Sequence, residues 1–289
     1  MGFMLKPEIK LVALDLDGTI LDSRGKIAAG VKETIGAARQ QGVVVTIATG
    51  RRLLSTQPFA EELGICLPLV VHNGAVVLDP WDGALLEHLP LKTAQAELVV
   101  ELGREYGLSA VVADNFLESE YFFYDDESKD AEMSAFASKA IGRVESLLPL
   151  KIREPLKVMF VDSREKIRRM LEPLQKALAA ETKIIVYGEE TTPRWGIEVF
   201  HQNSSKAHGV EIVARRYGFR REEILAMGDD FNDLEMVEYA GIGVAMGNGV
   251  AAVRAAADFV SGTNDEGGVA SALEKYVLLP GNKKAGGIV

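Results

Sequence analysis

The chain has 289 residues, of which 47% are hydrophobic, so it is long enough to bury a large core as one big domain or two ordinary ones. Its formal net charge of −10 and its pI near 5.1 argue against the broad basic surface that binding to nucleic-acid phosphates requires. We therefore expect a globular protein with no nucleic-acid partner.

The sequence predicts neither a disulfide framework nor a membrane anchor. Cys66 is the only cysteine, which excludes an intrachain disulfide and a multi-cysteine metal site, and we predict that it is a small buried side chain in a reducing compartment. The apolar stretch from Ile9 to Leu14 is far shorter than the roughly 18 apolar residues that span a bilayer. We expect cytoplasmic localisation and no membrane association.

Strand-like apolar runs alternate with helix-period segments in the first part of the chain. The runs KLVALD, VVVTIAT and PLVVH are separated by predicted helices over 28–41 and 52–63. A later stretch repeats this order, with a predicted helix over 206–217 and then EILAMGD, GIGVAM and DFV with helices over 231–240, 249–257 and 266–277. This alternation predicts parallel βαβ units in a Rossmann-like, doubly wound α/β sheet that both stretches can share.

The pattern changes between these two stretches. Asn73-Gly74 and Asp82-Gly83 are turn dipeptides that predict hairpins, and they are followed by predicted helices over 93–106 and 163–180. Predicted strands lie over 108–113, 120–124, 156–161, 183–187 and 195–200. We interpret this mixed order as an inserted α+β unit over 84–190, with residues 1–83 and 191–289 forming the α/β core.

Two aspartates, Asp15 and Asp17, end the first predicted strand in LVALDLDGT. Residues i and i+2 of a strand project from the same face, and Gly18 permits a sharp turn directly after them. Both carboxylates are then expected at the carboxyl edge of the sheet, where open α/β folds bind ligands. Two such anions repel each other, so a cation is expected beside them, and oxygen ligands alone make Mg²⁺ the first choice.

Further polar residues follow other strands of the predicted sheet. Thr49 and Gly50 come before a helix and offer a hydroxyl and backbone amides to an anion. Lys206 begins a predicted helix and can supply a cation for a phosphate. The segment GDDFND adds Asp229, Asp230, Asn232 and Asp233 around a glycine turn.

Together these segments resemble the four motifs of the haloacid dehalogenase (HAD) superfamily of phosphatases: DLDGT, the Thr49 of ATGR, Lys206 and GDDFND. A finer resemblance is to the Cof-type hydrolases with a C2 cap, through ATGRR, HNGA, GVAMGNG and ADFVSGTNDEGGVASAL. The similarity covers about 10–80 and 195–275. The chain departs from the usual Cof pattern at His72, where asparagine is common, and before Lys206, where HQNSS has no glycine.

The resemblance implies a Mg²⁺-dependent phosphatase acting on a small phosphorylated metabolite. It implies that Asp15 is the nucleophile that forms an aspartyl-phosphate and that Asp17 is the general acid and base. The metal is expected on Asp15, on the main-chain carbonyl of Asp17, on Asp229 and on Asp233. The remaining roles implied are phosphate binding by Thr49, Gly50, Lys206 and Asn232, and leaving-group contacts by Arg51, His72 and Asn73.

Some alternatives stay open at this point. A phosphomutase of the same superfamily would use the same aspartyl-phosphate, and a receiver-like signalling module also combines acids, a threonine and a lysine around magnesium. A receiver has its acid pair adjacent in sequence and has no large insertion, unlike the D-x-D spacing here. Sugar phosphates, flavin mononucleotide and pyridoxal phosphate are all candidate substrates, with sugar phosphates first, and the oligomeric state is not predicted. We interpret Asp230 as a helix N-cap or an exposed loop acid.

Overall fold

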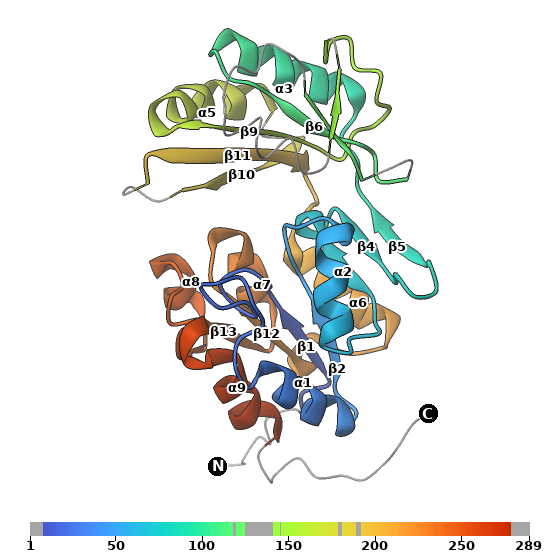
Figure 1. The fold of residues 1–289 in the computed structure, drawn as a ribbon, viewed down its shortest axis with the longest axis vertical. Coiled ribbons are helices and arrows are strands. Elements are labelled where there is room, and N and C mark those ends of the chain that lie inside the picture. The colour runs from blue at the N-terminus through green and yellow to red at the C-terminus, as the bar shows by residue number, and fades with distance from the viewer. Residues whose placement is uncertain are drawn as a thin grey trace. The chain divides into compact units, whose positions relative to one another are not determined.

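The computed structural model describes residues 8–117, 120–124, 141–144, 146–178, 181–188 and 192–278. The chain forms two compact units (Figure 1). Unit 1 comprises Met1–His88 and Ser205–Val289, and unit 2 comprises Leu89–Ser204. Unit 2 is therefore an insertion, as the sequence predicted, and the chain crosses between the units twice.

Unit 1 is built on a five-stranded parallel sheet. Its order is β14 (Phe259–Val260), β13 (Ile242–Ala245), β12 (Ile224–Gly228), β1 (Leu11–Leu14) and β2 (Val44–Ile47). In the central strand β1, Leu11 pairs with Ile224 on one side and with Val44 on the other. All four residues of β1 are buried, which agrees with its unbroken apolar sequence.

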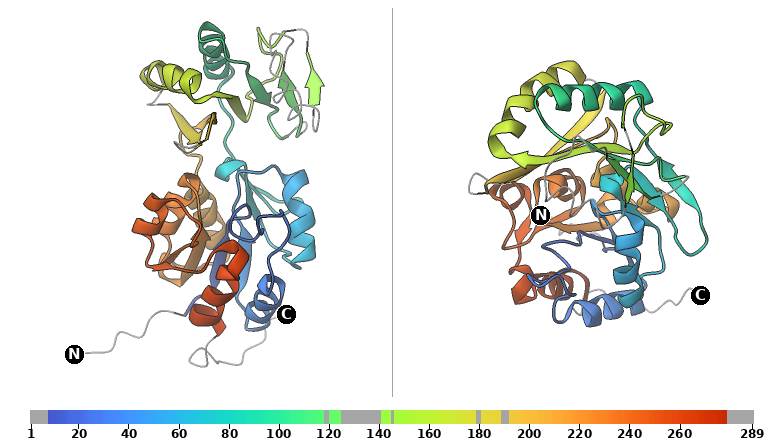
Figure 2. Two further views of the ribbon diagram at one scale, coloured as in Figure 1. Left: turned by 60° about the vertical axis from the view of Figure 1, so that its left-hand side comes forward. Right: turned by 45° about the horizontal axis from the view of Figure 1, so that its top comes forward.

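Helices cover both faces of this sheet (Figure 2). Helices α6 (Lys206–Arg216) and α7 (Leu234–Tyr239) pack together on one face, where their apolar residues join Leu11 and Ala13 of β1 in one core. Helices α1 (Val31–Gln40) and α9 (Gly268–Leu273) pack together on the other side. Helices α2 (Leu53–Glu62) and α8 (Ala251–Ala256) also belong to this unit.

A small antiparallel sheet extends unit 1 beyond β2. It consists of β3 (Leu69–Val71), β4 (Val76–Leu78) and β5 (Leu85–His88), and a parallel bridge between Ala48 and Val70 joins it to the main sheet. The two turns contain Asn73-Gly74 and Asp82-Gly83, so the predicted hairpins are confirmed.

In the part of unit 2 that the structure describes, two helices pack on one face of a six-stranded sheet. The sheet order is β10 (Thr182–Tyr187), β11 (Arg194–His201), β9 (Lys157–Ser163), β6 (Val111–Ala113), β7 (Phe122–Tyr124) and β8 (Ile141–Arg143), antiparallel except between β7 and β8. Helices α3 (Thr93–Glu105) and α5 (Arg164–Leu178) lie side by side on one face (Figure 1), over a core that includes Val158, Phe160 and Val199. Strand β8 was not predicted.

Two expectations need correction. The inserted unit runs from 89 to 204 instead of 84 to 190, because β5 pairs with β4 of unit 1, whereas β11 pairs with β9 and β10 of unit 2. A strand's apolar pattern does not tell which sheet it joins. Cys66 is exposed, not buried, in the loop between α2 and β3, where its thiol lies beside the carbonyl of Gly64. Over the described residues, the helices are too short or too polar to cross a bilayer.

Candidate active site

The first two acidic residues of the site follow neighbouring strands. Asp15 comes directly after β1, and Asp229 follows Gly228 at the end of β12. Leu14 pairs with Met227 in the parallel register, and the backbone N–H of Asp15 donates to the Met227 carbonyl at 3.0 Å. Parallel strands end at a common edge, so residues distant in sequence meet there.

Lys206 connects two of the acids through one ammonium group. Its Nζ lies 2.6 Å from Oδ1 of Asp15 and 2.6 Å from Oδ1 of Asp233, and all three side chains are buried. One carboxylate oxygen from each of Asp15, Asp229 and Asp233 lies within 4.8 Å of the other two. The structure thus brings Asp15, Lys206, Asp229 and Asp233 into one cluster.

The electrostatics of this cluster are unbalanced. Burial, together with the Asp233 carboxylate, raises the pKa of Asp229 to about 7. Burial also raises the pKa of Asp15 well above its ordinary value, an effect that Lys206 opposes and that Asp233 and Asp229 reinforce. Burial alone lowers the pKa of Lys206, but the carboxylates of Asp15 and Asp233 raise this pKa by more than burial lowers it. The ammonium therefore stays charged. Three carboxylates facing one ammonium leave an excess of negative charge.

The loop after β12 holds Asp233 in place. One oxygen of Asp233 accepts hydrogen bonds from the backbone N–H groups of Asp229 (2.9 Å) and Asp230 (3.0 Å). A Cβ at Gly228 would lie 2.4 Å from the Cβ of Asp233, so only glycine fits beside it. The Asp230 carboxylate accepts from the N–H of Phe231 at 2.7 Å as the N-cap of a short helix, which confirms its interpretation.

Asp17 lies apart from the carboxylate cluster, although only one residue separates it from Asp15. Its carboxylate is 58% exposed and is held by the guanidinium of Arg51, with Nε donating to Oδ2 at 2.7 Å. A second donor of Arg51 reaches the other oxygen, which makes the pair two-pronged. Strand β1 ends at Leu14 and Leu16 is already in a turn, so the two acids do not share one face of a strand.

Thr49, Gly50 and Arg51 form a loop that is bonded to the segment after β3. The N–H of His72 donates to the Arg51 carbonyl at 2.8 Å, and the N–H of Asn73 donates to the Thr49 carbonyl at 2.9 Å. His72 and Asn73 are buried and both have positive φ. Their backbone therefore shapes the loop that carries Thr49 and Arg51.

Asn232 also reaches this loop region. Its side-chain amide donates to Oδ1 of Asn73 at 2.9 Å. A Cβ on Gly50 would lie 3.1 Å from the same Oδ1, so Gly50, Asn73 and Asn232 are immediate neighbours. The predicted phosphate-binding residues Thr49, Gly50 and Asn232 thus share one side of the site.

Comparison with known proteins identifies the family. A family profile described as haloacid dehalogenase-like hydrolase matches residues 12–273. The chain belongs to this hydrolase family. This match confirms the resemblance seen in the motifs. Because the chain is a member of a hydrolase family, we no longer retain the receiver-like signalling module as an alternative.

Several relatives of this hydrolase are named as phosphatases. The 5-amino-6-(5-phospho-D-ribitylamino)uracil phosphatase YitU of Bacillus subtilis is 33% identical over 272 residues, which cover 93% of this chain and 98% of the relative. A haloacid dehalogenase-like hydrolase from Bacteroides thetaiotaomicron has a TM-score of 0.78 and 29% identity, covering 93% of this chain and 99% of its own. These likenesses identify a phosphoric monoester hydrolase.

A solved sugar phosphatase of HAD subclass IIB shares the fold, with a TM-score of 0.77 at 21% identity; the match covers 92% of this chain and 98% of that one. Unit 2 of this hydrolase is likewise an α+β unit inserted into the α/β core. The predicted fold class, an α/β core with an inserted cap-type unit, is therefore confirmed.

The acidic cluster of the hydrolase fits a divalent cation. Asp15, Asp229 and Asp233 offer oxygen atoms only, which is the donor set that Mg²⁺ prefers. Burial, followed by the nearby Asp233 carboxylate, raises the pKa of Asp229 to about 7, and Lys206 only partly opposes this. A cation among these three carboxylates would favour their ionised forms.

Three residues that contact the acidic cluster or the turn after Asp17 received no role in the sequence analysis: Thr19, Asn248 and Asn264. The hydroxyl of Thr19 donates to Oδ1 of Asp229 at 3.1 Å. A Cβ at Gly18 would lie 2.3 Å from Oδ2 of the same carboxylate. For Asn248 and Asn264, the available sequence signal is that a polar asparagine stands in each of the two loops after β13 and β14, in GNG and GTN.

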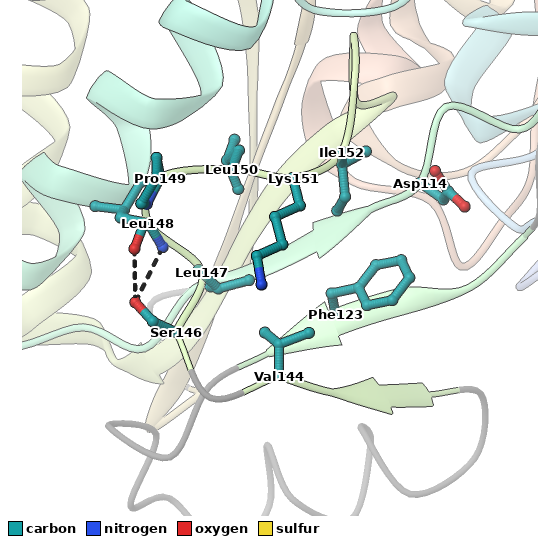
Figure 3. Close-up of a pocket in the computed structure, with 10 residues that line it drawn as sticks. All are labelled: Asp114, Phe123, Val144, Ser146, Leu147, Leu148, Pro149, Leu150, Lys151 and Ile152. Atoms are coloured by element: carbon teal, nitrogen blue, oxygen red, sulfur yellow. Dashed lines mark hydrogen bonds between the residues drawn. The ribbon is translucent and has the colours of Figure 1, made fainter.

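A cavity of about 610 Å³ lies within unit 2 (Figure 3). It is lined by Asp114, Phe123, Val144 and the segment 146–152, in which Ser146 and Leu148 are hydrogen-bonded. Most of these side chains are aliphatic or aromatic. Within the described residues, the three-acid cluster belongs to unit 1 and not to this cavity.

Proposed function

We propose that this hydrolase cleaves small phosphate monoesters with the help of Mg²⁺ and through an aspartyl-phosphate on Asp15. The observation that carries the proposal is the buried contact of Lys206 with Asp15 and Asp233 beside Asp229. A phosphate dianion repels nucleophiles, so a site for such esters must gather positive charge around a positioned nucleophile.

Asp15 supplies the nucleophile. In the first step one of its carboxylate oxygens bonds to phosphorus as the bond between phosphorus and the ester oxygen breaks. Contact with Lys206 at 2.6 Å fixes the carboxylate and favours its ionised form. The residue is also buried at the sheet edge, which limits competing contacts with water.

Asp17 acts as the general acid in the first step and as the general base in the second. It donates a proton to the leaving alkoxide in the first step, and in the second step it accepts a proton from the water that attacks the phosphorus of the aspartyl-phosphate. Inorganic phosphate then leaves and the carboxylate of Asp15 is restored. The exposed position of Asp17 and its orientation by Arg51 support this role, because the leaving group must exchange with solvent.

The remaining groups hold the phosphoryl oxygens. Thr49, the backbone amide of Gly50, Lys206 and Asn232 supply hydroxyl, N–H and ammonium donors from the loops at one sheet edge. Asp15, Asp229, Asp233 and the main-chain carbonyl of Asp17 would hold the metal. When bound, Mg²⁺ would neutralise charge on the carboxylates and on the phosphoryl oxygens.

The substrate proposed is a phosphate monoester with a sugar or sugar-alcohol chain. The support is that the relative YitU is named for a phosphoribityl compound. Arg51, His72 and Asn73 are proposed to set the position of the leaving group, the latter two through the loop that they support. Unit 2 is proposed to select the substrate.

Asp15→Asn tests the assignment of the nucleophile. The amide keeps the shape of the side chain but cannot attack, so kcat for p-nitrophenyl phosphate is expected to fall by roughly three orders of magnitude or more while the circular dichroism spectrum is unchanged. Asp82→Asn is the matched control, because Asp82 is an exposed turn residue whose carboxylate bonds to the N–H of Ala84. Near wild-type turnover in Asp15→Asn rejects the proposal.

A substrate panel tests the substrate class. Sugar phosphates, 5-amino-6-(5-phospho-D-ribitylamino)uracil, flavin mononucleotide and pyridoxal phosphate are compared by kcat/KM with and without MgCl₂. The proposal requires magnesium dependence and a preference for a sugar or sugar-alcohol ester. A phosphomutase would instead require a bisphosphate and return the group to the sugar without releasing phosphate.

A further inference from the structure

Two asparagines outside the four motifs donate hydrogen bonds to the segment Gly18–Leu21, which directly follows Asp17. The side-chain amide of Asn248 donates to the Gly18 carbonyl at 2.9 Å. The side-chain amide of Asn264 donates to the Leu21 carbonyl at 2.7 Å, in a buried position. The carbonyls at both ends of the segment Gly18–Leu21 are therefore held by side chains from the loops after β13 and β14.

The two asparagines are also joined to each other. The backbone N–H of Asn264 donates to Oδ1 of Asn248 at 2.9 Å, so Asn248 uses both ends of its amide. The loop of Asn264 is itself braced by a capping box, in which Thr263 donates to Glu266 from its N–H (3.1 Å) and its hydroxyl (2.9 Å).

The gripped segment touches the acidic cluster directly. Thr19 donates to one oxygen of Asp229 at 3.1 Å, and the backbone of Gly18 leaves no room for a Cβ beside the other oxygen. The loop of Asn248 contacts the same residue from another side, because the N–H of Val250 donates to the Asp229 carbonyl at 2.8 Å. A shift of the segment must therefore move the Asp229 carboxylate or break its contacts.

We propose that Asn248 and Asn264 are positioning residues, which form a clamp that fixes the segment Gly18–Leu21 against Asp229. This inference rests on the proposed function, since it assigns catalytic work to Asp17 and metal binding to Asp229. The clamp sets the distance between the proton-transfer residue and the metal-binding carboxylates. Partners that orient metal ligands are commonly worth about 10–100-fold in metal affinity or activity.

Asn264→Ala and Asn248→Ala test the clamp, with two readouts for each. The first is the affinity for Mg²⁺, measured by isothermal titration, and the second is kcat and KM for p-nitrophenyl phosphate. We expect Asn264→Ala to lose about 10–100-fold in magnesium affinity and a similar factor in kcat. Asn248→Ala loses less, because Asn248 is exposed and water can replace part of its contact.

The double variant separates a clamp from two independent contacts. Both side chains act on one segment, so the factor lost by the double variant is smaller than the product of the two single factors. A loss equal to that product contradicts action through a common segment. Asn248→Ala is a surface change and keeps the test open if Asn264→Ala does not fold.

Thr34→Val is the control for a purely structural loss. Thr34 is a buried residue of α1 whose hydroxyl donates to the Gly30 carbonyl at 2.7 Å, away from the acidic cluster. It is expected to lower the melting temperature and leave magnesium affinity and kcat within about twofold of wild type. If Asn264→Ala behaves like Thr34→Val, the clamp is rejected.

The two readouts also separate this inference from the proposed function. Wild-type protein that binds Mg²⁺ but does not turn over p-nitrophenyl phosphate contradicts the reaction, and the magnesium titration of the variants still decides the clamp. Wild-type turnover with unaltered variants contradicts the clamp alone. Wild-type protein that neither binds Mg²⁺ nor turns over the ester contradicts both.

Discussion

Among single residues, Asp15 and Asp17 show how one intervening residue can separate two environments. Asp15 is buried against Lys206, whereas Asp17 is mostly exposed and paired with Arg51. The i, i+2 spacing predicted that both carboxylates would crowd one point, but β1 ends at Leu14, before either acid, and the Asp17 carboxylate pairs with Arg51 instead. Two acids with different neighbours can take different chemical roles.

Arg51→Lys tests whether the guanidinium orients Asp17. Lysine keeps the charge but not the two-pronged fork, so we expect kcat to fall about tenfold with alkyl phosphates and less with p-nitrophenyl phosphate. The difference arises because p-nitrophenolate leaves without needing the proton of Asp17. The measurement is kcat over a series of leaving groups.

Arg24→Lys is the matched control for that variant. Arg24 grips Asp22 through Nε (3.0 Å) and through a second nitrogen (2.7 Å), so the same kind of pair is weakened at another place. Equal losses with every leaving group in Arg51→Lys would contradict an effect on proton donation.

At the level of elements, the strands and helices of unit 1 were largely predictable, because β1, β2 and β12 are short, mostly apolar runs and the helices between them have clear periodicity. Strand β8 is only three residues long and was not found. The clamp was also beyond the sequence, because Asn264 and Leu21 meet only once β14 and β1 have joined one sheet. The hydrophobic pattern of a sequence predicts local conformation, whereas contacts between distant residues depend on how the strands are arranged in the sheet.

Gly18→Ala and Gly25→Ala form a pair that measures the contact of this turn with Asp229. Both glycines have positive φ, 77° and 71°, so each substitution is expected to cost about 1–2 kcal/mol of stability. Only the Cβ at position 18 meets the Asp229 carboxylate, at 2.3 Å, while nothing lies within 4 Å of a Cβ at position 25. We therefore expect a loss of magnesium affinity of at least tenfold in Gly18→Ala alone, measured by calorimetry. Equal affinities would show that the carboxylate moves aside freely.

For the whole molecule, the raised pKa of Asp229 makes the stability of the metal-free fold depend on pH. Asp229 has a pKa of about 7 in the folded protein and 3.8 ordinarily, so between these values the folded state holds a proton that the unfolded chain releases. This carboxyl therefore stabilises the metal-free fold fully below about pH 3.8, and that contribution is lost as the pH rises through 7.

The same pKa predicts the pH dependence of metal affinity. A proton on Asp229 must leave before Mg²⁺ can bind, so the affinity at pH 6 is expected to be about tenfold weaker than at pH 8. Isothermal titration at both pH values, repeated with Asp229→Asn, is the measurement. A pH-independent affinity in the wild-type protein would contradict the assignment of Asp229 as a ligand.

The pairing of Leu11 with Ile224 affects how the protein can fold while it is being synthesised on the ribosome. Unit 2 (Leu89–Ser204) has been fully synthesised before either Lys206 or β12 emerges. Until then β1 has only β2 beside it, and its other edge is an open template for mispairing. Translation that stops before Ile224 leaves Asp15 without the strand that brings Asp229 beside it, so such truncated products contain all of unit 2 but lack the acidic cluster.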